Sequence, residues 1–258
     1  MLKIMCLAVT LTLAMPCLVF AQNAASNKAF FASVTDGVTL APVNSQGWSA
    51  PVTIYTIPAA LKTSSVGAVS AILSMEAALW TYNLTTALIT ADTTTKNHSS
   101  GTGSSSSRAA IKAWVEIDGV PMEPAVLVSP GSPGSPPVVD GVVYADRLQA
   151  TGLTVNLFCN GTDSTGLPFQ TCFVTGDITL ELFQQTKSAN SFAFYLGPLT
   201  AKIHRVEVKA QALIECRTNG SVAPCPQATL DGYTNAQTMA AIGKSTLMLE
   251  EQQNFGSQ

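Results

Sequence analysis

Apolar and polar side chains alternate along much of this chain. In residues 69–82 the odd positions from 69 to 79 are aliphatic or Met, and the even positions carry two serines, a glutamate and two aromatic side chains. Residues 111–117 and 204–214 repeat the alternation. Successive side chains of a strand point to opposite faces, so the pattern predicts strands with one buried face. A helix is the rival for residues 69–82, because Ala, Met, Leu and Glu favour helices.

Shorter segments of the same kind are separated by Pro, Gly and Asn clusters. We expect further strands in six ranges, namely 51–58, 142–149, 151–158, 171–183, 191–196 and 244–251. The Asp118-Gly119 pair after residues 111–117 predicts a tight turn, because both residue types accept positive φ. Many strands without a convincing long helix predict an all-β fold. The expected architecture is a single antiparallel β-sandwich domain of jelly-roll type.

Two segments interrupt the alternation. Residues 92–108 are low in complexity and rich in Ser and Thr, and residues 129–137 form a Pro/Gly/Ser run. We interpret both as flexible inserts of one domain that spans residues 49–251. An N-terminal segment, residues 22–48, precedes this domain, and a disordered tail is expected at residues 252–258.

Residues 1–21 have the pattern of a secretory signal peptide. Lys3 gives the positive start, residues 4–20 are apolar, and cleavage after Ala21 fits the small-residue rule. The alternatives are a membrane anchor, for which the segment is short, and a lipoprotein signal at Cys17. Export with cleavage is favoured, to a periplasm or out of the cell, and the remaining chain has no stretch able to span a membrane.

Export changes the interpretation of the cysteines. Four remain after cleavage, an even number in an oxidising compartment, at positions Cys159, Cys172, Cys216 and Cys225. Three pairings are possible, and we favour Cys159–Cys172 with Cys216–Cys225, because each pair flanks a polar loop that contains Gly. A zinc site is disfavoured, since no C-x-x-C spacing occurs.

Composition excludes some functions. The chain has 258 residues, only 11% of them charged, and a formal net charge of −3, so it lacks the basic excess that nucleic acids require. Metal and nucleotide motifs are missing as well, and no metal or cofactor is expected.

His204 is the most notable titratable residue. It lies in phase with the inward face of residues 204–214, and the expected role is structural, with a bond to a carbonyl or to a carboxylate such as Asp146. Asp146 beside Arg147 looks like an ion pair or a loop anchor. The functional alternative for His204 is a general base, a pH switch or one member of a Ser–His–Asp triad.

Carboxylates and aromatic rings provide the other candidates. A glycosidase would need two of the carboxylates near strands, which are Glu76, Glu116, Asp118, Glu123 and Asp146. Trp80, Tyr82 and Trp114 lie off the aliphatic phase of their strands. They form either a sugar-binding platform or additional core, and burial is the commoner fate of such rings.

Several segments resemble a group of uncharacterised exported proteins from environmental bacteria and archaea. The motif pieces are Ile117-Asp118-Gly119, Ala145-Asp146-Arg147-Leu148-Gln149, Ala189-Asn190-Ser191-Phe192-Ala193-Phe194 and His204-Arg205-Val206-Glu207-Val208. This chain has Ile-His-Arg where the group often has Val-His-Thr, and its inserts are longer. The resemblance implies a secreted β-sandwich and carries over no catalytic residue.

Three functions follow as hypotheses. The favoured one is a secreted, non-catalytic binding or cell-surface module of unknown ligand, because no catalytic motif accompanies the strand pattern. The second is a polysaccharide hydrolase or carbohydrate-binding module that uses exposed aromatics and carboxylates. The third is a structural subunit of an assembly. The partner would therefore be a carbohydrate or a protein.

Overall fold

The computed structural model describes most of the predicted domain. The described residues are 29–34, 38–40, 47–63, 66–91, 98–130, 138–158, 176–230 and 233–252. The expected signal peptide, Cys159 and Cys172, and parts of both inserts and of the tail lie outside these ranges. No described residue belongs to a helix long and apolar enough to cross a membrane.

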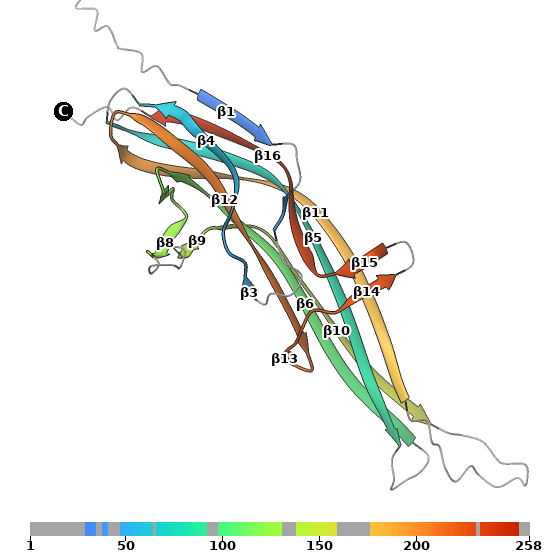
Figure 1. The fold of residues 1–258 in the computed structure, drawn as a ribbon. Coiled ribbons are helices and arrows are strands. Elements are labelled where there is room, and N and C mark those ends of the chain that lie inside the picture. The colour runs from blue at the N-terminus through green and yellow to red at the C-terminus, as the bar shows by residue number, and fades with distance from the viewer. Residues whose placement is uncertain are drawn as a thin grey trace, which may run out of the picture.

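The protein is all-β, with two facing antiparallel sheets that are joined where residues 90–91 pair with residues 99–100 (Figure 1). Sheet A has the order β1 (Ala29–Val34), β16 (Met239–Gln252), β5 (Gly67–Ala91) and β11 (Gly176–Leu199). Sheet B has the order β4 (Val52–Lys62), β12 (Ile203–Thr218), β6 (His98–Ile117) and β10 (Val142–Phe158). These eight strands can be renumbered 1 to 8 in chain order, from β1 to β16. Sheet A then has the order 1-8-3-6, and sheet B has the order 2-7-4-5. This order is that of a jelly roll, as predicted.

Short strands extend these sheets or project from them. Four of them pair with the long strands: β2 (Val38–Thr39), β3 (Gly47–Trp48), β7 (Val120–Pro121) and β13 (Ser221–Val222). Two small hairpins form separately, β8 (Val126–Ser129) with β9 (Val138–Asp140) and β14 (Gln227–Leu230) with β15 (Tyr233–Gln237).

The core lies between the two sheets and follows the predicted alternation. The odd positions of β5, from Val69 to Leu79, are buried against the inward positions of β6, β12 and β16. Residues 69–82 therefore form a strand, and the helical alternative is wrong. Burying aliphatic area of this kind is the main stabilising contribution in a sandwich.

An arm forms where β5, β6, β10 and β11 run past the ends of the other strands (Figure 1). The pairing of β16 with β5 ends at Trp80, and the pairing of β12 with β6 ends at Ser105. Beyond these points β5 pairs with β11 and β6 with β10. Hydroxyl groups join the buried aliphatic side chains here: Thr85 bonds Ser105 at 2.6 Å, and Thr151 bonds both.

The prediction of a flexible insert at residues 92–108 is wrong for residues 98–108, which belong to β6. The side chains there are small because β5 and β6 approach closely in the arm and leave no room for larger ones. A Cβ on Gly101 would lie 2.5 Å from the Leu88 carbonyl oxygen, and one on Gly103 would clash with that of Thr86. The strands predicted at 142–149 and 151–158 are likewise one continuous strand, β10.

Two local predictions match the structure. Asp118 and Gly119 both have positive φ, 53° and 83°, and form the turn between β6 and β7. Cys216 and Cys225 form a disulfide across a separation of nine residues, which is the pairing favoured from the sequence.

Candidate functional site

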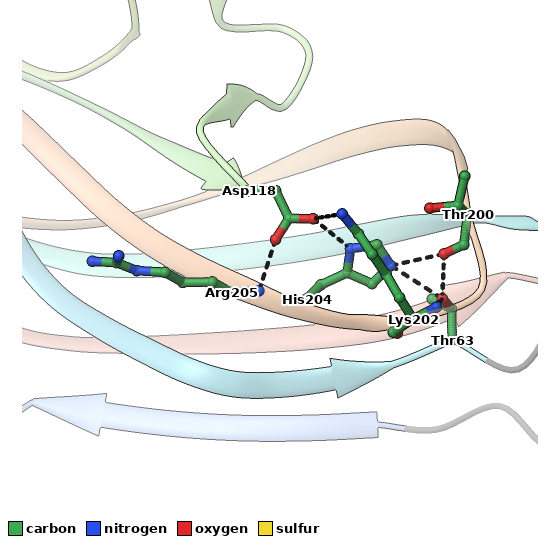
Figure 2. Close-up of polar contacts among 6 residues, drawn as sticks. All are labelled: Thr63, Asp118, Thr200, Lys202, His204 and Arg205. Carbon is green, nitrogen blue, oxygen red and sulfur yellow. Dashed lines mark hydrogen bonds and ion pairs between the residues drawn. The ribbon is translucent and has the colours of Figure 1, made fainter.

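His204 lies at the centre of a polar cluster at one end of the sandwich (Figure 2). Its ring is fully buried, and Nδ1 lies 2.9 Å from Oδ2 of Asp118. Nε2 lies 3.0 Å from the hydroxyl of Thr63 and 3.0 Å from the carbonyl oxygen of Thr200. The cluster thus joins the β6–β7 turn, the end of β4 and the loop before β12.

Asp118 is the anchor of this cluster. Its Oδ1 accepts the backbone N–H of Arg205 at 2.9 Å, and its Oδ2 also accepts the Lys202 ammonium at 2.8 Å. Burial alone would raise the pKa of the Asp118 carboxyl. The hydrogen bonds from Lys202, from the Arg205 amide and from His204 outweigh burial and lower that pKa to about 2.

The cluster resembles a nucleophilic triad, because a carboxylate contacts an imidazole and the imidazole contacts a hydroxyl. These groups belong to Asp118, His204 and Thr63. The surroundings favour a structural role instead. Thr63 is only 2% exposed, and its hydroxyl donates to the Thr200 carbonyl at 2.8 Å. The proton that a general base would remove is therefore already committed, and a substrate could not reach the oxygen without local opening.

The structure corrects the partners predicted for His204 and Asp146. His204 bonds Asp118, whereas Asp146 forms a bidentate pair with Arg108 across the β6–β10 ladder. Arg147 does not pair with Asp146, because neighbouring residues of a strand point to opposite faces. Its guanidinium reaches Thr81 of β5 and both Thr186 and Gln184 of β11.

Two contacts involve the sequence segments quoted above for their resemblance to other exported proteins. Asp118 and His204 join in the polar cluster described above. In the second pair, the side-chain amide of Asn190 in β11 donates to the Tyr144 carbonyl in β10 at 2.6 Å. The ring of Tyr144 also packs edge-on against Phe192, with centroids 4.8 Å apart. The Asn190 contact thus joins sheet A to sheet B, whereas the Asp118–His204 contact lies within sheet B.

Of the two alternatives for the aromatic rings, the commoner one, burial, describes Tyr82 and Trp114. Tyr82 and Trp114 are each 1% exposed, and Trp80 is half-buried. Trp114 does face away from the aliphatic core, as its phase predicts. The outer face of sheet B is covered there, and a Cβ on Gly141 would lie 2.7 Å from the Trp114 ring. Trp48, which the pattern did not single out, is the more exposed ring, at 39%.

The candidate carboxylates do not gather in one cleft. Glu76 lies on the outer face of sheet A and pairs with Lys187 at 3.0 Å. Glu116 lies on the outer face of sheet B and is almost fully buried, contrary to the solvated charge expected on that face. Among the described residues, no three His, Cys, Asp or Glu side chains are grouped as a metal site requires.

Comparison with known proteins adds little. No protein-family model matches the chain, and no curated protein does. Among solved structures, the chain is similar to the VP2 subviral particle of infectious bursal disease virus, with 9% sequence identity and a TM-score of 0.18. The match covers 88% of this chain and 42% of the viral chain. The structure of the Gx strain of that virus has 7% sequence identity and a TM-score of 0.15, and the match covers 88% of this chain and 42% of the viral chain. Likeness this low supports no conclusion about function.

Proposed function

We propose that this protein is an exported, non-catalytic jelly-roll subunit that associates with a second copy of itself through β11. The observation that carries the proposal is the exposure of this strand. β11 is 24 residues long, and within it only Phe194 is buried. Its one neighbouring strand among those described is β5.

An edge strand of this length invites pairing with another chain. Proteins commonly protect such edges with prolines, bulges or inward-pointing charges. β11 has a register shift and a proline, Pro198, but both come only after Leu196, at the end of the strand. Near the same end, Glu123 forms a β-bridge with Tyr195. The stretch before them runs in unbroken register with β5.

The arm also leaves apolar groups uncovered on the inward side of β11. Ile178 and Leu180 lie opposite Ala87 and Thr85 of β5, so they face the same side as the buried residues of that strand. They are nevertheless 39% and 41% exposed. Covering these side chains would remove apolar surface from water and favour association.

Charge complementarity indicates a second copy as the occupant. An antiparallel β11–β11 pairing centred on Gln184 places Lys187 of each copy opposite Glu181 of the other. Both residues lie on the outer face of sheet A, opposite Ala78 and Leu84. Opposite charges facing each other across a ladder contribute about 0.2–1 kcal/mol per pair. The same register lays the arm of each copy along the body of its partner.

Two further features support the remaining parts of the proposal. The buried, internally bonded hydroxyl of Thr63 favours a structural role for the one triad-like cluster. The apolar segment at residues 1–21 and the Cys216–Cys225 disulfide both suit an oxidising compartment outside the cytoplasm.

Charge reversal tests the interface. We expect Lys187→Glu and Glu181→Lys each to weaken dimerisation about tenfold in sedimentation equilibrium, a loss of about 1.4 kcal/mol. The double variant should restore the wild-type dissociation constant. Arg217→Glu is the matched control, because Arg217 is also a half-exposed base beside a carboxylate, Glu215, but lies in sheet B. A double variant as weak as either single variant would remove β11 as the interface.

A further inference from the structure

The outer face of sheet B contains a cavity that the assembly role does not use. It has a volume of about 230 Å³ and lies between the start of β4 and β9. Ala50, Pro51 and Val139 form its walls, and Trp114, Glu116 and Lys209 contribute to its lining from β6 and β12. This face should be a solvated sheet surface by its sequence pattern, yet it is partly enclosed.

A buried ion pair lies in this cavity. Glu116 is 3% exposed, and its Oε2 accepts the Lys209 ammonium at 2.6 Å. Its Oε1 accepts the indole N–H of Trp114 at 2.7 Å. Removing such a pair from water costs several kcal/mol per ion before the mutual attraction is counted. Both charged groups line the cavity, so a ligand that enters it would meet them directly.

Lys112 ties the two sides of the cavity together. Its side chain is 8% exposed, and its ammonium donates to the Val139 carbonyl in β9 at 3.1 Å. The same ammonium lies 4.6 Å from the centre of the Trp48 ring, on the β3 side, where a cation–π contact forms. One buried cation therefore holds both rims, so the cavity is formed before any ligand enters.

The polar groups of the cavity suit hydroxyls. The ammonium of Lys209 has three N–H donors, of which two face Glu116 and Glu207. Each oxygen of the Glu116 carboxylate retains a further lone pair beyond its one bond. The hydroxyl of Thr53 adds a group that both donates and accepts at the exposed side. Donors and acceptors thus lie beside apolar walls within a few ångströms.

We propose that this cavity binds one neutral sugar ring. The charges of Glu116 and Lys209 cancel, which disfavours an ionic ligand, while together they can bond neighbouring hydroxyls. Pro51 and Val139 can contact the C–H face of a pyranose. A volume of about 230 Å³ matches a single ring rather than a drug-sized ligand. This site is separate from β11 and does not depend on the dimer.

Titration with simple glycosides tests the site. The probes are the methyl glycosides of glucose, galactose, mannose and N-acetylglucosamine, observed through the indole N–H signals of Trp48 and Trp114 by NMR. We expect at least one glycoside to shift both signals saturably. Thr53→Val, which removes only an exposed hydroxyl, should weaken that binding about tenfold without changing the thermal unfolding midpoint.

Two comparisons make the outcome decisive. Thr154→Val, an exposed threonine of β10 in the same sheet, should leave binding unchanged. Lys209→Met, which removes the ammonium, should abolish binding, and its fold is checked by the dispersion of the remaining amide signals. No saturable shift with any of the four glycosides, or binding that Thr53→Val leaves intact, would overturn the proposal. Stronger shifts with acetate or phosphate than with every glycoside would overturn it too, because the ligand would then be an anion.

Discussion

At the scale of single residues, the His204 cluster shows how a catalytic-looking arrangement can be structural. Asp118, His204 and Thr63 come from three separate segments, and each of their polar atoms is bonded within the protein. Buried polar groups stabilise a fold only when they are paired in this way. The cluster therefore fixes the end of the sandwich where the β6–β7 turn meets β12.

Acid should weaken this cluster through Asp118. Its pKa is lowered to about 2 in the folded protein, below the ordinary value of 3.8. A lowered folded pKa contributes stability that is present above pH 4 and lost as the pH falls toward 2. We expect Asp118→Asn to lower the free energy of unfolding at pH 6, and the difference from wild type to shrink between pH 4 and pH 2. Urea unfolding at a series of pH values measures this, and a difference that stays constant across the window would contradict it.

At the scale of elements, the arm depends on residues too small to look structural. The Gly-Thr-Gly-Ser run of β6 lets the backbones of β5 and β6 approach closely, as the clearances at Gly101 and Gly103 show. Such close approach is a recognised use of Gly within a strand. The hydroxyl network of Thr85, Ser105 and Thr151 then satisfies the polar groups enclosed there.

Adding one methyl group should therefore damage the arm. We expect Gly103→Ala to destabilise the protein by about 1–3 kcal/mol, the usual range for overpacking, because the new Cβ meets backbone. Gly152→Ala on the paired strand β10 is the matched control, since nothing lies within 4 Å of its Cβ. It should change stability by less than about 0.5 kcal/mol. Equal effects of the two substitutions in chemical denaturation would argue against close packing of β5 on β6.

The sequence predicts the elements better than their partners. Alternation identifies β5, the second half of β6 and β12, because each has one face in the aliphatic core. Alternation misses the first half of β6, because Gly and Ser side chains show no alternation of apolar and polar positions. Small residues occur there because the backbone of β5 lies too close for larger side chains. Alternation assigns His204 to the inward face correctly but cannot name Asp118, which lies 86 residues away, as its partner.

The outer face of sheet B shows the same limit. Trp114 and Glu116 share the polar phase of β6, which predicts solvent exposure. They are buried because β9 and the segment before β4 cover that face. A sequence signal did exist: Lys112, Trp114 and Glu116 alternate on β6, while Glu207, Lys209 and Gln211 alternate on β12. Once the register is known, Lys209 lies opposite Trp114, and its ammonium reaches Glu116 on the diagonal.

At the scale of the whole molecule, the two ends of the sandwich differ in character. The body has an aliphatic core closed by the His204 cluster. The arm encloses a hydroxyl network beside its buried aliphatic side chains and leaves Ile178 and Leu180 exposed along β11. Pairing of two copies through β11 would cover these side chains and bring each arm against the body of its partner. Such pairing would account for the length of the four arm strands.

The molar mass of the purified protein in solution tests this account most directly. Light scattering across a range of concentrations should give twice the mass of one chain at the upper end, decreasing toward one chain on dilution. The decrease should shift to higher concentrations in Lys187→Glu. A mass of one chain at every concentration would contradict the central claim.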